Sequence, residues 1–251
     1  MLKISHIQAY SDNYIWLIQT NEGNTLVDPG DASPVLDFIQ REEIEIDDIL
    51  ITHHHFDHVG GLQSLKPLIK GSIIGPESKN IDKLDYKVKD GELITTIGLE
   101  FSVIEIPGHT LDHIAFYSNT EKEVLFCGDT IFSGGCGRVF EGTHEEMFHS
   151  LNKIKNLPPD TKIYCGHEYT NSNLNFCLEH DPKNTHLKDK KIDIEKKLNS
   201  NQPTIPSTIA DEIKTNIFLR CDDPEIKQGL GLKDSSDVEV FSKLRDLKDS
   251  F

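Results

Sequence analysis

Four potential metal ligands lie within six consecutive positions of this 251-residue chain. The segment 52–58 reads THHHFDH and follows a short apolar run. In an extended segment side chains alternate, so His53 and His55 project to one side and can bind one ion. The chain turns before Asp57 and His58, which can therefore face a second ion. A lone histidine is usually solvated or hydrogen bonded for structural reasons, but four ligands in this order predict a metal site.

Three more candidate ligands each follow a short run that predicts a buried strand. These runs are rich in apolar and β-branched residues and lead into a glycine, which is typical of strands that end in a loop. Open α/β sheets build their sites beyond the carboxyl ends of strands, and a glycine before the ligand lets the backbone turn sharply. The ligands and their preceding runs are His109 after 101–106, Asp129 after 123–127 and His167 after 161–165.

The number of ligands predicts two metal ions. Five histidines and two aspartates exceed the four ligands of a tetrahedral zinc. The predicted sets are His53, His55 and His109 for the first ion, Asp57, His58 and His167 for the second, and Asp129 as a bridge. Two divalent ions with two aspartates and one hydroxide leave a surplus of positive charge, which suits the stabilisation of a developing oxyanion.

The order of these motifs resembles the metallo-β-lactamase superfamily. An HxHxDH motif precedes a GH, a GD and a second GH, although HxHxDH alone is typical of the whole superfamily. Further segments make nearly the entire chain similar to one of its families, the hydroxyacylglutathione hydrolases, or glyoxalase II. These segments are SDNYIWLI at 11–18, VDPGDA at 27–32, GCGRVFEGT at 135–143, CGHEYT at 165–170, PTIPSTIADE at 203–212, TNIFLR at 215–220 and the terminal RDLKDSF.

The resemblance implies an α/β fold with two domains. Residues 1–167 are expected to form a catalytic four-layer αβ/βα sandwich, and residues 168–251 a small, mainly α-helical, substrate-binding domain. The sequence pattern agrees with this division. Strand-like runs in the first part alternate with amphipathic stretches at 33–41, 59–69 and 143–156, and the remainder is mostly helical in pattern.

The resemblance also implies a reaction, the hydrolysis of the thioester of S-(2-hydroxyacyl)glutathione, typified by S-lactoylglutathione. The products are glutathione and a 2-hydroxy acid, in the second step of methylglyoxal detoxification. A water that bridges two metal ions has its pKa lowered and serves as a hydroxide nucleophile, which Asp57 is expected to orient as the catalytic residue. The thiolate leaving group, with a thiol pKa near about 8.5, needs no general acid. Zinc is the expected metal, and iron and manganese accept the same ligands.

Four residues are expected, by similarity, to contact glutathione: Arg138, Tyr169, Arg245 and Lys248. Glutathione carries two carboxylates, so an acidic protein needs a local group of basic side chains to attract it. Arg138 stands where the resemblance predicts lysine, and Phe140 stands where it predicts tyrosine. The affinity for glutathione is therefore expected either to be weaker or to depend more on Tyr169.

Composition argues against several classes of protein. The formal charge of −16, from 42 acidic and 26 basic residues, disfavours binding to a nucleic acid backbone. No run approaches the roughly 20 apolar residues that span a bilayer, and the N-terminus has no signal-like apolar segment. Five scattered cysteines argue against a disulfide framework and favour a reducing compartment. We expect a cytoplasmic monomer with a small-molecule glutathione thioester as its partner, and neither nucleic acid nor membrane.

The sequence leaves two other classes of function as alternatives. A glutathione persulfide dioxygenase of the same superfamily needs one iron, held by two histidines and a carboxylate. A noncatalytic binding protein would be expected to lose metal ligands, and none is lost here. A different hydrolase of the superfamily, such as a lactonase, would have no need of Arg245 and Lys248.

Three residues near the predicted site have competing interpretations. Asp28, in a DPG segment, is read as a turn residue, with the orientation of a ligand as the alternative. His113 is either a core histidine or a support for the metal site. His54 is expected to point away from the metals because side chains alternate along the segment.

Overall fold

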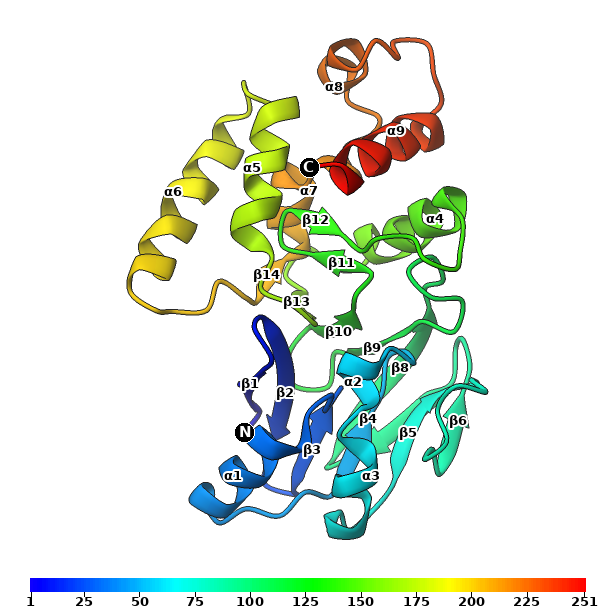
Figure 1. The fold of residues 1–251 in the computed structure, drawn as a ribbon, viewed down its shortest axis with the longest axis vertical. Helices are drawn as coiled ribbons and strands as arrows, with labels where there is room; N and C mark the ends of the chain where they lie inside the picture. The colour runs from blue at the N-terminus through cyan, green and yellow to red at the C-terminus, as the bar shows by residue number, and fades with distance from the viewer. The chain divides into compact units, whose positions relative to one another are not determined.

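The computed structural model describes all 251 residues, which form two compact units (Figure 1). The first unit contains residues 1–105 and 112–128, and the second contains residues 106–111 and 129–251. This division differs from the predicted domain boundary after residue 167, which stays a prediction.

The first unit contains a six-stranded sheet with the order β1-β2-β3-β4-β5-β6. An antiparallel hairpin of β1 and β2 leads into β3, and β3 to β6 pair in parallel. Parallel strands are normally covered on both faces, which explains their apolar, β-branched sequences. The strands are β1 (Lys3–Ala9), β2 (Asn13–Gln19), β3 (Asn24–Val27), β4 (Asp48–Leu50), β5 (Ile73–Pro76) and β6 (Tyr86–Val88).

Short helices and the first sheet share an apolar core. Helix α1 (Ala32–Glu42) is capped by Asp31, whose side chain accepts a hydrogen bond from the backbone N–H of Ser33 in the first turn. Its buried Val35 belongs to the same core cluster as Leu26 and Ile49 of the sheet. The amphipathic stretch 59–69 is divided among α2 (Phe56–Val59), α3 (Leu62–Leu65) and the 3-10 turn η1 (Lys66–Leu68). Two glycines in this stretch disfavour the helical backbone conformation, and its proline lacks the N–H that a helix interior requires.

A second sheet has the strand order β14-β13-β10-β9-β8-β7. Its antiparallel strands β7 (Leu93–Thr96), β8 (Leu99–Glu105), β9 (Ile114–Ser118) and β10 (Val124–Gly128) belong to the first unit. Buried hydroxyls of Thr25 on β3 and Thr96 on β7 lie 2.8 Å apart. This hydrogen bond joins the two sheets within the first unit.

The second unit is mainly helical. Its core contains four phenylalanine rings, in which Phe218 stacks on Phe176 and packs against Phe241, and Phe241 contacts Phe148. Helices α4 and α9 both begin with capping boxes. The helices are α4 (His144–Lys155), α5 (Thr170–His180), α6 (Thr185–Asn199), α7 (Ile209–Thr215), η2 (Ile217–Leu219), α8 (Pro224–Gly229) and α9 (Asp237–Asp249), and the strands are β11 (Ile131–Phe132), β12 (Gly135–Cys136), β13 (Lys162–Cys165) and β14 (Ser207–Thr208).

All five cysteines are buried and carry free thiols. None of the helices combines the length and the apolar character required to cross a bilayer.

Candidate metal centre

The histidine cluster lies between the end of β4 and the first turn of α2. His53 is fully buried and His58 is 1% exposed, so neither ring is a surface feature. The Nδ1 atom of His53 lies 3.0 Å from the hydroxyl oxygen of Thr52, so this nitrogen is used in a hydrogen bond. A ring held at Nδ1 presents Nε2 to a metal.

Asp28 orients this cluster from the loop after β3. Its carboxylate accepts hydrogen bonds from the backbone N–H of Thr52 at 2.8 Å and from the Thr52 hydroxyl at 2.7 Å. A third contact, 3.0 Å from Oδ2 to Nδ1 of His58, requires that Nδ1 carry the proton. The lone pair of His58 then lies on Nε2, as a metal ligand requires. The interpretation of Asp28 as only a turn residue is therefore incomplete, because the buried carboxylate also sets the tautomer of a predicted ligand.

Asn13, which the sequence reasoning did not identify, supports Asp57. Its Nδ2 atom donates to Oδ2 of Asp57 at 2.9 Å, and Asn13 itself is 5% exposed. The same Oδ2 lies 3.6 Å from Nε2 of His58. The loop before α1 packs closely here, since a Cβ on Gly30 would lie 1.7 Å from the carbonyl oxygen of Asp57. The motif SDNYIWLI contains Asn13, but nothing in that string indicates a contact with a residue 44 positions away.

Replacing Asn13 with alanine is expected to weaken metal binding without unfolding the protein. The Asp57 carboxylate would lose a donor that fixes its direction, and partners of this kind typically contribute about 10- to 100-fold in metal affinity. Competition with a chelator measures the effect. An Asn13→Gln variant keeps the amide but moves it by one methylene. Its zinc affinity should therefore lie between those of Asn13→Ala and the native protein. An unchanged zinc affinity in Asn13→Ala would contradict the prediction.

The second unit brings together His109, Asp129 and His167. Oδ2 of Asp129 lies 3.5 Å from Nε2 of His109 and 3.1 Å from Nε2 of His167. Two atoms that each bind a tetrahedral zinc at about 2.0 to 2.1 Å are roughly 3.3 Å apart. These distances therefore fit two imidazoles and a carboxylate placed around metal ions. All three side chains are buried.

His109 and His167 are held in place by different contacts. His109 donates from Nδ1 to the carbonyl oxygen of Arg138 at 2.7 Å, which leaves Nε2 as the ligand atom. The ring of His167 stacks on Tyr169, with centroids 4.8 Å apart and planes 5° from parallel. Phe140 contacts the His109 ring edge to face at 5.3 Å.

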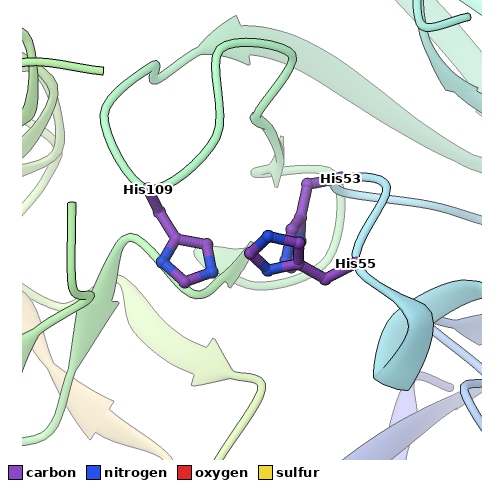
Figure 2. A group of neighbouring side chains, drawn as sticks. All are labelled: His53, His55 and His109. Atoms are coloured by element: carbon purple, nitrogen blue, oxygen red, sulfur yellow. The ribbon is translucent and has the colours of Figure 1, made fainter. Parts of the chain in front are cut away.

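The predicted ligands form two groups. Ligand atoms of His53, His55 and His109 all lie within 4.8 Å of one another, as do those of Asp57, His58 and His167. Figure 2 shows the three imidazoles of the first group turned toward one another. Imidazole nitrogens with one or two carboxylates are a donor set that divalent zinc, iron and manganese accept. The residues therefore fit the predicted metals.

The two remaining histidines of the neighbourhood have structural contacts. Nδ1 of His54 lies 2.9 Å from both carboxylate oxygens of Asp112. His113 is fully buried and stacks on His53, with centroids 4.5 Å apart and an interplanar angle of 14°. Its Nδ1 atom also lies 3.1 Å from the carbonyl oxygen of Ile114. His113 thus supports the ring of a predicted ligand.

The predicted substrate-binding residues differ in how accessible they are. Tyr169 is 37% exposed and the Arg138 side chain is half exposed. Lys248 lies over the rings of Phe176 and Phe251, and burial, followed by the charge of Arg245, lowers the pKa of its ammonium group. Arg245 is only 4% exposed.

Arg245 is occupied by contacts within the protein. Its Nη1 donates to the carbonyl oxygens of Cys136 at 2.8 Å and Gly137 at 3.4 Å. Its Nε and Nη2 bind Oδ1 of Asp249 at 3.1 and 2.9 Å. Asp249 also accepts from Nε of Arg138 at 3.2 Å. One carboxylate therefore holds both arginines.

Comparison with known proteins covers the whole chain. The metallo-β-lactamase superfamily model matches residues 11–167, and the model of the hydroxyacylglutathione hydrolase C-terminus matches residues 168–251. A hydroxyacylglutathione hydrolase of Photobacterium profundum is 46% identical over 255 residues, and one of Pseudomonas aeruginosa is 43% identical over 258 residues. Both alignments span 100% of each chain.

A solved structure shows the same fold. The crystal structure of the BLEG-1 B3 metallo-β-lactamase has a TM-score of 0.64 and 22% identity, and it covers 87% of this chain and 99% of its own. The fold and the site thus define a member of the metallo-β-lactamase superfamily, and the predicted α/β sandwich with a helical C-terminal part is confirmed. Within that superfamily, the chain belongs to the hydroxyacylglutathione hydrolase family, as its motifs predicted.

Proposed function

We propose that this chain hydrolyses the thioester of S-(2-hydroxyacyl)glutathione, with S-lactoylglutathione as the typical substrate. The products are glutathione and a 2-hydroxy acid such as lactate, which places the reaction second in methylglyoxal detoxification. The full-length identity with hydroxyacylglutathione hydrolases supports the substrate class. The observation that carries the chemistry is the position of the Asp129 carboxylate, 3.5 and 3.1 Å from the Nε2 atoms of two histidines.

Seven residues are proposed to hold two divalent ions, most simply zinc. They are His53, His55 and His109 for one ion, Asp57, His58 and His167 for the other, and Asp129 for both. When bound, two such ions make a water nucleophilic near neutral pH and attract the carbonyl oxygen of the thioester. The chain itself fixes the ligands. Asp28 and Thr52 hold two rings at Nδ1, and the Arg138 carbonyl holds a third.

Asp57 is proposed to orient the attacking water as well as to bind metal. Asn13 donates to Oδ2 of Asp57 and limits the rotation of the carboxylate. The glutathione thiolate leaves without a proton donor, because a thiol pKa of about 8.5 makes the thiolate an adequate leaving group.

Recognition of the glutathione part is proposed to involve Arg138, Tyr169 and Lys248, together with Arg245. Arg138 and Tyr169 are exposed enough to contact a substrate. Phe140 is 61% exposed and packs an apolar edge against His109, where a tyrosine would have offered a hydroxyl. We therefore assign recognition of the glutathione peptide to Tyr169 rather than to Phe140.

The remaining predicted properties also belong to the proposal. We place the protein in the cytoplasm and treat it as a monomer, with a small-molecule substrate and no nucleic-acid or membrane partner. The acidic composition supports the exclusion of nucleic acids, since a formal charge of −16 repels a phosphate backbone.

Metal analysis combined with an assay on S-lactoylglutathione tests the function. We expect two metal ions per chain and a loss of at least about 100-fold in turnover after chelation, because metal activation of water and charge stabilisation disappear together. Added zinc should restore the activity. A single iron per chain, with oxygen consumption on glutathione persulfide and no thioester cleavage, would support the dioxygenase alternative instead. Full turnover by metal-free protein would refute the mechanism.

A further inference from the structure

We propose that Arg245 and Asp249, at the end of α9, are positioning residues for the metal ligand His109. This inference rests on the proposed role of His109 in metal binding. The resemblance assigned Arg245 to the substrate, and within the chain its contacts also lead to the loop 136–138. That loop carries the carbonyl group that orients the His109 ring.

The first step links α9 to the loop. A guanidinium group has five N–H donors and no acceptor. In Arg245, Nη1 donates to the carbonyl oxygens of Cys136 and Gly137, and both Nε and Nη2 donate to the Asp249 carboxylate. The side chain is only 4% exposed, so these contacts hold most of the guanidinium group inside the second unit.

The second step links the other end of the loop to the same helix. The Arg138 side chain donates from Nε to Oδ1 of Asp249 at 3.2 Å and from Nη2 to the backbone oxygen of Asp249 at 3.1 Å. The three consecutive residues 136–138 are thus all bound to the last two turns of α9. Because the contacts act on both sides of Gly137, the peptide planes of this loop have little freedom to rotate.

The third step links the loop to the metal site. The carbonyl oxygen of Arg138 accepts the Nδ1 proton of His109 at 2.7 Å. The backbone passes so close to the ligands that a Cβ on Gly137 would lie 1.9 Å from the carbonyl oxygen of Asp129 and 3.2 Å from Nδ1 of His109. A shift of the loop would therefore turn the His109 ring and move Nε2 away from Oδ2 of Asp129.

For the removal of Arg245, electrostatic repulsion and the positioning role predict opposite changes in metal affinity. Removing a positive side chain near a cation site should slightly strengthen metal binding, because it removes repulsion. If Arg245 holds the loop, its removal should weaken metal binding, because a partner that orients a metal ligand typically contributes about 10- to 100-fold in affinity. The sign of the change therefore separates the two effects.

The test compares Arg245→Met with Lys248→Met. Both variants remove one positive charge from α9, three residues apart, but Lys248 contacts Ser172 and the rings of Phe176 and Phe251 rather than the loop. Zinc-loaded proteins are titrated with a chelator, and KM and kcat are measured at saturating and limiting zinc. We expect Arg245→Met to bind one zinc about 10- to 100-fold more weakly, with kcat restored by excess zinc. Lys248→Met should keep its zinc affinity within about twofold and show a raised KM.

Two further variants keep the test decisive if Arg245→Met does not fold. Arg245→Lys retains the charge and reaches one carbonyl at most, and Asp249→Asn retains the Arg245 donors but removes their carboxylate. Both variants should lower the affinity for zinc, as Arg245→Met does. Circular dichroism and thermal melting of the metal-free proteins verify that they fold. Native zinc affinity in folded Arg245 variants, with only a raised KM, would overturn the proposal and leave Arg245 with a role in substrate binding alone. A His109→Ala variant that keeps both zinc ions would instead refute the proposed metal site.

Discussion

Replacing Asp129 with asparagine is expected to weaken both metal ions together and to lower kcat/KM by at least about 10²- to 10³-fold. Oδ2 of Asp129 lies within 3.5 Å of the Nε2 atoms of His109 and His167, one from each ligand group. Asparagine has nearly the same shape but no charge, and its amide nitrogen cannot bind a cation. Metal content after dialysis and steady-state kinetics measure the two effects.

An Asp112→Asn variant is the matched control for this change. It makes the same substitution near the site, at a carboxylate that binds His54. We expect it to retain two ions per chain. If Asp129→Asn loses only one ion and keeps the other at native affinity, Asp129 does not bridge them, and the two sites are separate.

Substitution of Asp28 should separate the stability of the fold from the affinity for metal. Asp28→Ala removes the acceptor for two donors of Thr52 and for Nδ1 of His58, all of them buried. Each buried donor left without an acceptor costs about 1–3 kcal/mol, so the total is a large part of a typical stability of about 5–15 kcal/mol. Urea denaturation of the metal-free protein is expected to show this loss.

Asp28→Asn should fold but bind zinc about 10- to 100-fold more weakly. Asn is one of the few residues that tolerates the backbone conformation here, with φ at +52°. Its NH₂ group cannot accept the proton on Nδ1 of His58, which favours the tautomer with the proton on the ligand nitrogen Nε2. Asp31→Asn is the control, because Asn caps helix α1 about as well as Asp. Equal zinc affinity in the Asp28 and Asp31 variants would contradict the tautomer argument.

The candidate metal ligands could be named from the sequence because local rules govern their placement. Alternation in an extended chain separates His53 and His55 from their neighbours, and a glycine after an apolar run places His109, Asp129 and His167 at strand ends. The strand-rich first part and the helical remainder followed from hydrophobic periodicity in the same way. The division of 59–69 into short helices also has a local cause, in its glycines and proline.

The residues that hold those ligands were not predictable by such rules. Asp28 contacts His58 across 30 positions, Asn13 contacts Asp57 across 44, and Arg245 contacts Cys136 across 109. No periodicity relates residues so far apart, and an aspartate before proline and glycine has a sufficient local explanation as a turn. Only the folded chain shows which carboxylate meets which imidazole.

By itself, the sequence determined which side chains are candidates to bind metal, the family to which the chain belongs and the division into a strand-rich first part and a helical remainder, since spacing and side-chain chemistry act over a few residues. The tertiary structure alone decided the tautomer of His58, the direction of the Asp57 carboxylate and the assignment of Arg245 to the loop 136–138. A buried polar group has to find a partner wherever packing places it, and packing depends on the whole chain.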